Sequence, residues 1–302
     1  MNKSYSTMKF RTELQTGKSP LVLDPRRPVA LVGSCFAHNV AEKMQESGWE
    51  VFCSAGTLYN PFSIAKVLSM LLIEDEWEET LRRSLFDADG IVHSWLFDSH
   101  FSSPDAERCV DAVKEMRHSL RQTLADAQAL IVTFGTAWCY VLESKPDYVV
   151  ANCHKQHPAS FIRKRITVSE ISEEWCRLIE LLRRCYPSLT VIFTVSPVRH
   201  LKDGFEGNSR SKATLLLAAE EICEKCRDTY YFPSYEIVCD DLRDYRFYAS
   251  DLVHPSDFAV EYIWEKFRQT YVDDTGEKML GTWRKERMQR LHRPIIRKDS
   301  GS

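Results

Sequence analysis

A strand, a turn and a helix are predicted in immediate succession in Val29-Ala-Leu-Val-Gly-Ser-Cys-Phe-Ala-His-Asn-Val40. Its first four residues form a continuous apolar run, which is typical of a strand buried in a parallel sheet. Gly33 and Ser34 interrupt the run, and from Phe36 onward apolar residues recur at helical spacing. Ser34 and Cys35 are therefore predicted to lie on a sharp turn between a strand and a helix.

This turn is a favourable place for chemistry. Open α/β sheets bind their ligands at the carboxyl edge, where the turn lies. The unpaired N–H groups at the start of the helix favour an anion or a developing oxyanion. Ser34 and Cys35 bring a hydroxyl and a thiol to this position, and both groups can act as nucleophiles. A simpler interpretation, in which Ser34 only caps the helix, explains that residue equally well.

The composition is that of an ordinary globular chain. Its 302 residues can bury a full core as one large domain. A net charge of −3 gives no reason to expect a nucleic acid or an acidic membrane as partner. No apolar run approaches the roughly 18 residues that a spanning helix needs, and the first ten residues lack the apolar core of a signal peptide. We therefore expect a cytoplasmic protein whose cysteines are reduced.

Short apolar runs alternate with amphipathic segments along the rest of the chain. Further strands are predicted at residues 49–53, 129–134, 189–195 and 230–238. Helices are predicted at residues 63–72, 77–84, 105–127, 167–182, 212–226 and 260–267, and residues 199–210 are expected to form a polar loop. Strands that alternate with helices in this way predict an α/β fold with a three-layer parallel sheet.

The expected organisation is one domain with two extensions. Residues 1–27 are expected to form an arm packed on the domain, residues 28–272 the α/β domain, and residues 273–302 a charged tail. The domain carries a helical and loop insertion at about residues 57–105. The aromatic-rich part of the insertion is predicted to be a short hairpin or lid near the site, with a flap that only covers the core as the alternative. A second hairpin is predicted at residues 141–152.

Four loops follow predicted strands and therefore converge on one edge of the sheet. They are residues 33–36, 135–138, 196–200 and 251–254. Together they bring Ser34, Asp251 and His254 to that edge. A nucleophile, a carboxylate and an imidazole are the three groups that nucleophilic acyl transfer needs at neutral pH. The Asp-x-x-His spacing alone is weak support, because it arises often by chance.

Five stretches, in order along the chain, resemble one protein family. Gly33-Ser34-Cys35-Phe36-Ala37 spells the signature that names the GSCFA family. The other four stretches are Thr133-Phe-Gly-Thr-Ala-Trp138, Asn152-Cys-His-Lys155, Thr194-Val-Ser-Pro-Val-Arg199 and Asp244-Tyr-Arg-Phe-Tyr-Ala-Ser-Asp-Leu-Val-His-Pro255. The match covers roughly residues 21–267.

The GSCFA family is similar to the SGNH/GDSL hydrolases, so the resemblance implies a flavodoxin-like α/β/α fold. It also implies ester hydrolysis or acyl transfer on lipids or decorated sugars. By position, Ser34 matches the nucleophile, His254 the general base and Asp251 its orienting partner. Cys35 is then expected to point toward the core if Ser34 points out of the turn.

The stretch Thr133–Trp138 matches the third conserved block of the wider superfamily, but this sequence departs from that block at one position. Gly135 matches its glycine, but Ala137 stands where an asparagine is expected. Oxyanion donors must then be backbone N–H groups at Ser34 or Cys35 and at Gly135, or another amide such as Asn152 or Asn208. Losing one such donor typically costs about 10²–10³ in rate, so this departure favours a binding role over turnover.

Three other positions remain open to more than one interpretation. His154 is placed near the site as a polar wall, although a structural role explains it as well. Arg199 suits a substrate carboxylate or phosphate, and a structural salt bridge explains it equally. Asn208 is expected to open a helix together with Ser211 and Lys212, either as a cap or at a ligand anion.

The preferred hypothesis is a serine esterase that acts on a small acyl ester or an acylated carbohydrate. It needs no metal or organic cofactor, and Cys223-Glu-Lys-Cys226, the C-x-x-C of the chain, is not expected to bind zinc. Two alternatives stay open. One is an acyltransferase with Cys35 as nucleophile, and the other is a binding protein without turnover.

Overall fold

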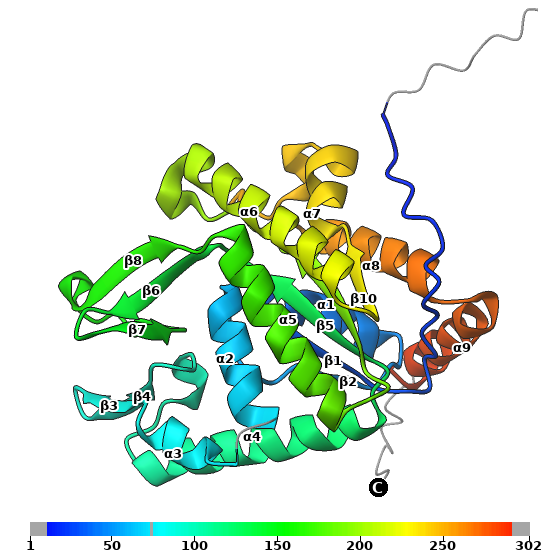
Figure 1. The fold of residues 1–302 in the computed structure, drawn as a ribbon. Coiled ribbons are helices and arrows are strands. Elements are labelled where there is room, and N and C mark those ends of the chain that lie inside the picture. The colour runs from blue at the N-terminus through cyan, green and yellow to red at the C-terminus, as the bar shows by residue number, and fades with distance from the viewer. Residues whose placement is uncertain (1–10, 73–74, 292–302) are drawn as a thin grey trace, which may run out of the picture.

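A five-stranded parallel sheet forms the centre of the computed structural model, which describes residues 11–72 and 75–291 (Figure 1). Its strands are β1 (Val29–Gly33), β2 (Val51–Phe52), β5 (Ala129–Phe134), β9 (Thr190–Val195) and β10 (Thr229–Phe232). Their spatial order is β10-β9-β5-β1-β2, and all neighbours are parallel. Numbered along the chain, this is the 2-1-3-4-5 order of flavodoxin-like sheets. The predicted fold class is confirmed.

Helices cover both faces of the sheet because alternate strand residues face opposite layers. Ala30 and Val32 share one buried cluster with the first set of helices, and Val29 and Leu31 share another with the second set. The first set is α2 (Pro61–Leu72), α4 (Ala106–Asp126), α5 (Val168–Cys185) and α6 (Gly204–Lys225). The second set is α1 (Cys35–Glu46) and α8 (Asp257–Tyr271), which lie behind the sheet in Figure 1.

Two small antiparallel sheets extend from the same side of the domain (Figure 1). The first is the hairpin β3 (Leu85–Ala88) and β4 (Ile91–Ser94), which follows α3 (Trp77–Arg82). The predicted hairpin is thus confirmed, but its expected place near the site is not, because none of its residues lines the cavity at the sheet edge. The second has the order β7-β6-β8 and consists of β6 (Trp138–Leu142), β7 (Lys145–Val150) and β8 (Phe161–Arg165). The hairpin expected at residues 141–152 is therefore two strands of a larger sheet.

Two element boundaries were predicted wrongly. The strand expected at residues 230–238 ends at Phe232, because Pro233 cannot continue the hydrogen-bonded ladder. Helical turns α7 (Ser234–Glu236) and η4 (Ile237–Leu242) follow. The expected polar loop 199–210 is mostly helical, since α6 begins at Gly204 and the ion pair Glu206–Arg210 supports its first turns. Polar side chains on an exposed first turn hide helical periodicity.

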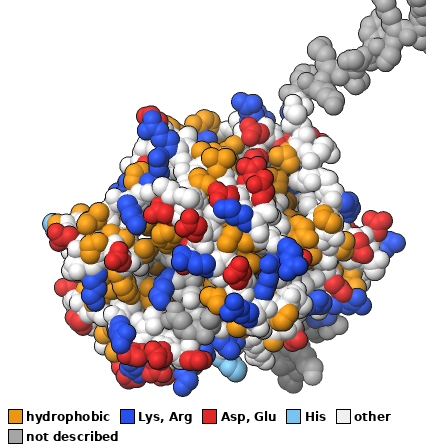
Figure 2. Space-filling view, in the orientation of Figure 1, with side chains coloured by type: hydrophobic (Ala, Val, Ile, Leu, Met, Phe, Trp, Pro, Cys, Tyr) orange, Lys and Arg blue, Asp and Glu red, His pale blue; other side chains and the backbone are white. Residues whose placement is uncertain are grey.

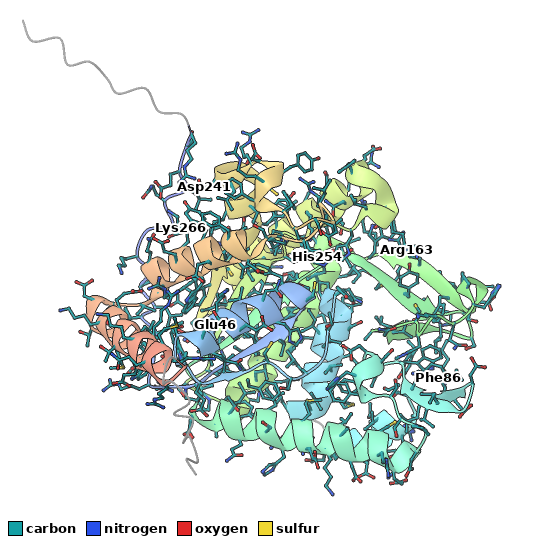
Figure 3. The ribbon with its side chains drawn as sticks, turned by 180° about the vertical axis from the view of Figure 1, so that it is seen from behind. Glu46, Phe86, Arg163, Asp241, His254 and Lys266 are labelled. Carbon is teal, nitrogen blue, oxygen red and sulfur yellow. The ribbon has the colours of Figure 1, made fainter. Side chains whose placement is uncertain are left out.

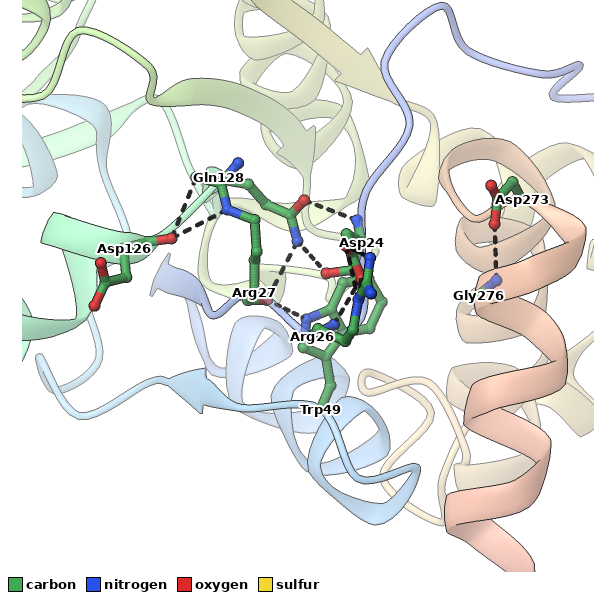
Figure 4. Close-up of polar contacts among 8 residues, drawn as sticks. All are labelled: Asp24, Arg26, Arg27, Trp49, Asp126, Gln128, Asp273 and Gly276. Carbon is green, nitrogen blue, oxygen red and sulfur yellow. Dashed lines mark hydrogen bonds and ion pairs between the residues drawn. The ribbon is translucent and has the colours of Figure 1, made fainter.

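The side chains of Gln128 and Arg27 join the N-terminal segment to the residues just before β5 (Figure 4). The Gln128 amide accepts from Asp24 N at 2.8 Å and donates to Asp24 O at 2.7 Å. Further along, Leu23 N donates to Tyr271 O, at the end of α8. At the other end, Asp273 accepts from Gly276 N at the start of α9 (Asp274–Leu291). The outer parts of the expected arm and tail, residues 1–10 and 292–302, lie outside the described residues.

The surface mixes both charges. In Figure 2, Lys and Arg side chains are interspersed with Asp and Glu side chains over the visible face. In the part of the chain that the structure describes, no helix is both long and apolar enough to cross a membrane.

Candidate active site

A cavity of about 410 Å³ opens at the carboxyl edge of the central sheet. Its walls come from the turn after β1, from β6 and β8, from the segment after β7, from the loop after β9 and from the loop before α8. Side chains that face it include Cys35, Trp138, Asn152, His200, Lys202 and His254. Three of the four loops that were expected to converge therefore contribute near their predicted positions, and the 33–36 turn contributes through its cysteine.

At the turn after β1, the structure reverses the expected orientation of two side chains. Cys35 lines the cavity, whereas Ser34 is 1% exposed and does not line it. Ser34 is the N-cap of α1, with an extended backbone, but its hydroxyl makes no capping bond and has no hydrogen-bond partner in the described structure. The helix begins at Cys35, so the first helical side chain, rather than the cap, projects over the sheet edge. The expectation that Cys35 points to the core was wrong.

Gly135 explains where the Ser34 side chain goes. A Cβ atom added at Gly135 would lie 3.2 Å from Ser34 Cβ and 2.9 Å from Tyr59 O. The absence of a side chain at this position therefore lets the turns after β1 and β5 pack closely, with Ser34 enclosed between them.

Asp251 and His254 form a fixed acid–imidazole pair. His254 Nδ1 lies 2.6 Å from Asp251 Oδ2, and Asp251 Oδ1 accepts from the N–H groups of His254 and Val253 at 3.0 and 2.9 Å. These two backbone bonds, ahead of the imidazole itself, lower the pKa of Asp251 to about 2. The carboxylate is therefore ionised at neutral pH and holds the proton of His254 on Nδ1. Nε2 is left for the cavity that His254 lines.

The thiol of Cys35 is not activated by its surroundings alone. Burial raises its pKa, and the N–H groups of Phe36 and of Cys35 itself and the charge of Lys212 lower it by less. No hydrogen bond joins the sulfur to His254 among the described residues. At neutral pH the group is a thiol, so a base must remove its proton before it attacks.

Of the backbone oxyanion donors that were expected, the N–H of Cys35 is available, whereas that of Gly135 is not. The N–H of Gly135 is already used, because it donates to Tyr59 O at 2.8 Å. The N–H groups of Cys35 and Phe36 are the first two of α1 and lie toward the Cys35 sulfur. Such terminal groups lack an acceptor within their helix. They are the backbone donors available to an oxyanion formed at this sulfur.

Lys212 is buried beside the cavity and pairs with no carboxylate of the described residues. The residue is 1% exposed, and its Nζ donates to Gly135 O at 2.6 Å and to Ser196 O at 2.7 Å. These carbonyls follow β5 and β9, so one side chain holds both loops in place. Burial lowers the pKa of Lys212 to about 7. The sequence placed this residue at the start of a helix, whereas it lies within α6.

His200 is a second imidazole in the cavity wall that the sequence did not single out. Burial, followed by the charge of Lys212, lowers its pKa to about 4, so it is neutral at pH 7. Its Nε2 is buried without a hydrogen-bond partner in the described structure. The Ser196-Pro-Val-Arg-His200 loop was recognisable, but the burial of this ring depends on Tyr59, whose ring it meets edge-on at 5.8 Å.

Of the other site residues predicted from the sequence, two line the cavity and two lie outside it. Asn152 and Arg199 line the cavity. His154 does not line it, since its Nε2 lies 2.8 Å from Ser94 O and its ring supports the inserted segment. Asn208 also lies outside, because it is buried in α6 and accepts from His200 N at 3.0 Å. Figure 3 shows His254 and Arg163 apart from Phe86, which lies on the hairpin that His154 supports.

The position of Ala137, where an asparagine was expected, lies away from the cavity. Ala137 is buried, and its N–H donates to Ser211 Oγ at 2.8 Å, so the position does not reach the cavity. Within residues 11–72 and 75–291, no cluster of three or more His, Cys, Asp or Glu side chains is arranged to hold a metal ion.

The model of the GSCFA family matches residues 28–267. Solved structures with a similar chain course include a Streptococcus pneumonia protein described as a platelet activating factor (10% identity, 82% of this chain and 84% of that chain, TM-score 0.43). Another is a Parabacteroides merdae protein described as a GDSL-like lipase (10% identity, 83% of this chain and 97% of that chain, TM-score 0.42). A third is a carbohydrate esterase family 2 enzyme with a carbohydrate binding domain from Corynascus thermopiles (11% identity, 87% of this chain and 69% of that chain, TM-score 0.42). No curated protein matches the chain.

Proposed function

The chain belongs to the GSCFA family, and we propose that it is an acyl hydrolase of the SGNH type that uses a cysteine nucleophile. Cys35 attacks the ester, His254 is the general base, and Asp251 orients the imidazole. The observation that carries this proposal is that Cys35 and His254 line one cavity while Asp251 holds Nδ1 of the imidazole at 2.6 Å. Ser34, the nucleophile implied by the resemblance, is replaced because its hydroxyl does not reach that cavity.

The proposed reaction has two half-steps. Nε2 of His254 takes the thiol proton of Cys35 as the sulfur attacks the ester carbonyl carbon. The carbon–oxygen bond breaks, the alcohol leaves with the proton from His254, and a thioester remains on Cys35. His254 then takes a proton from water, which attacks the thioester, and the thiol leaves with that proton. A second alcohol in place of water would make the same chemistry an acyl transfer.

The proposal is tested by hydrolysis of 4-nitrophenyl acetate. Cys35→Ala and His254→Ala are each expected to lower kcat/KM by about 10³-fold or more, since each removes a member of the reacting set. Ser34→Ala is expected to retain most of the activity, because the hydroxyl makes no hydrogen bond. Retained turnover in Cys35→Ala, together with loss in Ser34→Ala, would return the nucleophile to the serine.

A ligand-binding protein without turnover is the second candidate. It is favoured by the raised pKa of the thiol and by the lack of a Cys35–His254 hydrogen bond in the described structure. In that case the native protein would turn over no activated ester, although iodoacetamide would still label Cys35.

A further inference from the structure

Three buried nitrogen atoms in the cavity wall have no hydrogen-bond partner in the described part of the chain. They are Nε1 of Trp138, Nε of Arg163 and Nε2 of His200. The first two can only donate, and the neutral imidazole of His200 can donate from Nε2 when its proton is there. A buried donor without an acceptor costs free energy. A ligand that brings oxygen acceptors to this wall would satisfy them.

The same wall carries more positive than negative charge. Its charged side chains are Arg163, Arg199, Lys202 and one carboxylate, Asp203. Asp203 is already paired with Arg163, and its side chain is 5% exposed. Lys202 and Arg199 make no ion pair with any described residue. Two cations are therefore left for an anionic ligand.

The aromatic rings of the wall support cations instead of leaving their faces open. The Arg163 guanidinium carbon lies 4.2 Å from the centroid of the Trp138 ring, and Lys202 Nζ donates to Tyr140 Oη at 2.7 Å. The Arg199 guanidinium carbon likewise lies 4.2 Å from the centroid of the ring of Tyr248, which does not line the cavity. A neutral sugar binds by stacking on open aromatic faces, and Arg163 occupies one face of Trp138. The rings here hold the cations in position over the cavity.

We propose that the substrate carries an anionic oxygen group, a carboxylate or a phosphate, on the part that does not react. Trp138 of β6 and Arg163 of β8 bind this group together with Lys202, which follows β9, while the ester lies at Cys35. The inference rests on the proposed function for the position of the ester, but the anion site itself stands on the wall alone. Arginine and lysine are the side chains suited to both anions.

The test compares two activated esters with acyl chains of four carbons. Mono(4-nitrophenyl) succinate ends in a carboxylate, and 4-nitrophenyl butyrate ends in a methyl group. We expect kcat/KM to be about tenfold or more higher for the succinate ester at low ionic strength. Lys202→Met, and independently Trp138→Phe, which leaves an aromatic ring but removes the N–H donor, should each lower that ratio about fivefold or more. Lys145→Met is the matched control, because Lys145 is exposed on β7 outside the cavity and should leave the ratio unchanged.

A binding measurement separates this inference from the proposed function. Free succinate, glycerol phosphate and glycerol are titrated calorimetrically into the native protein and into both variants, after their urea midpoints have shown that they are folded. At least one anion should bind, more weakly to the variants, and the tighter one distinguishes a carboxylate from a phosphate site. Turnover with equal preference for both esters and no anion binding would overturn the inference and leave the proposed function standing. If the native protein bound an anion, the variants lost that binding and no ester were turned over, the inference would stand and the proposed function would be overturned.

Discussion

The burial of the Cys35 sulfur has a measurable effect on its reactivity. Because burial raises its pKa above the ordinary value of 9.0, little thiolate exists at pH 7. We expect iodoacetamide to label Cys35 more slowly than the exposed Cys185 at pH 7, and the rate to climb steadily through pH 9. Peptide mass spectrometry measures both sites in one sample, so Cys185 is the internal reference. Faster labelling of Cys35 than of Cys185 at pH 7 would show a thiolate already formed.

Lys212 couples the stability of the protein to pH. Its pKa is about 7 in the folded protein against an ordinary 10.5, so above pH 7 the unfolded chain binds the proton that the folded chain has lost. Stability contributed by this group therefore rises with pH from about 7, by at most about 1.4 kcal/mol per pH unit. Thiols with raised pKa values oppose this trend only near pH 9 and above, so pH 7 to 8.5 is the window to examine.

The Lys212 effect is isolated by comparing variants. Urea unfolding of the native protein should show stability rising between pH 7 and 8.5, and Lys212→Met should flatten that rise. Lys278→Met, at an exposed position of α9, is the control and should keep the native slope. If the native and Lys212→Met slopes were equal, the lysine would be protonated in the folded protein throughout the window.

At the scale of elements, the close approach of β1 and β5 depends on Gly33. Its φ is +132°, and a Cβ atom there would lie 2.2 Å from Thr133 O. Gly33→Ala should therefore lower the free energy of unfolding by about 2 kcal/mol or more, since both the backbone conformation and the paired strand oppose the methyl group. Urea midpoints measure this loss.

Gly281 provides the matched substitution. It lies within α9, and apart from its chain neighbours and the helix's own backbone, no described atom lies within 4 Å of a Cβ added there. Gly281→Ala should be neutral or stabilise the protein by up to about 1 kcal/mol, because alanine favours a helix interior. Equal losses from the two substitutions would contradict the close contact at β1.

Across the whole molecule, the features that could be predicted from the sequence are those that depend on residues close together in the chain. Apolar runs and helical spacing are local, so the strand–turn–helix at residues 29–46 and the alternation of strands and helices were predictable. The directions of the Ser34 and Cys35 side chains depend on two details. The helix α1 begins at Cys35, one residue before the predicted start, and Gly135 has no side chain to occupy the space that Ser34 fills. Neither can be derived from spacing.

The missed residues depend on contacts between distant segments. Lys212 is buried because α6 begins two turns earlier than predicted and because it meets carbonyls after β5 and β9. His154 looked like a site residue beside Asn152, but a left-handed backbone, with φ of 46°, turns it toward the inserted segment. Long-range packing of this kind leaves no periodic signal in the sequence.

The small β7-β6-β8 sheet enters and leaves the domain at a single point. Ile166 N donates to Ala137 O at 2.8 Å, so the residues just before β6 and just after β8 are hydrogen-bonded to each other. A segment whose two ends meet can be exchanged without moving its scaffold. Two of the three side chains proposed to bind the anion, Trp138 and Arg163, lie within this segment, whereas Lys202 and the proposed reacting residues lie outside it. Replacing residues 138–165 should therefore change which ester is preferred while Cys35, Asp251 and His254 stay in place.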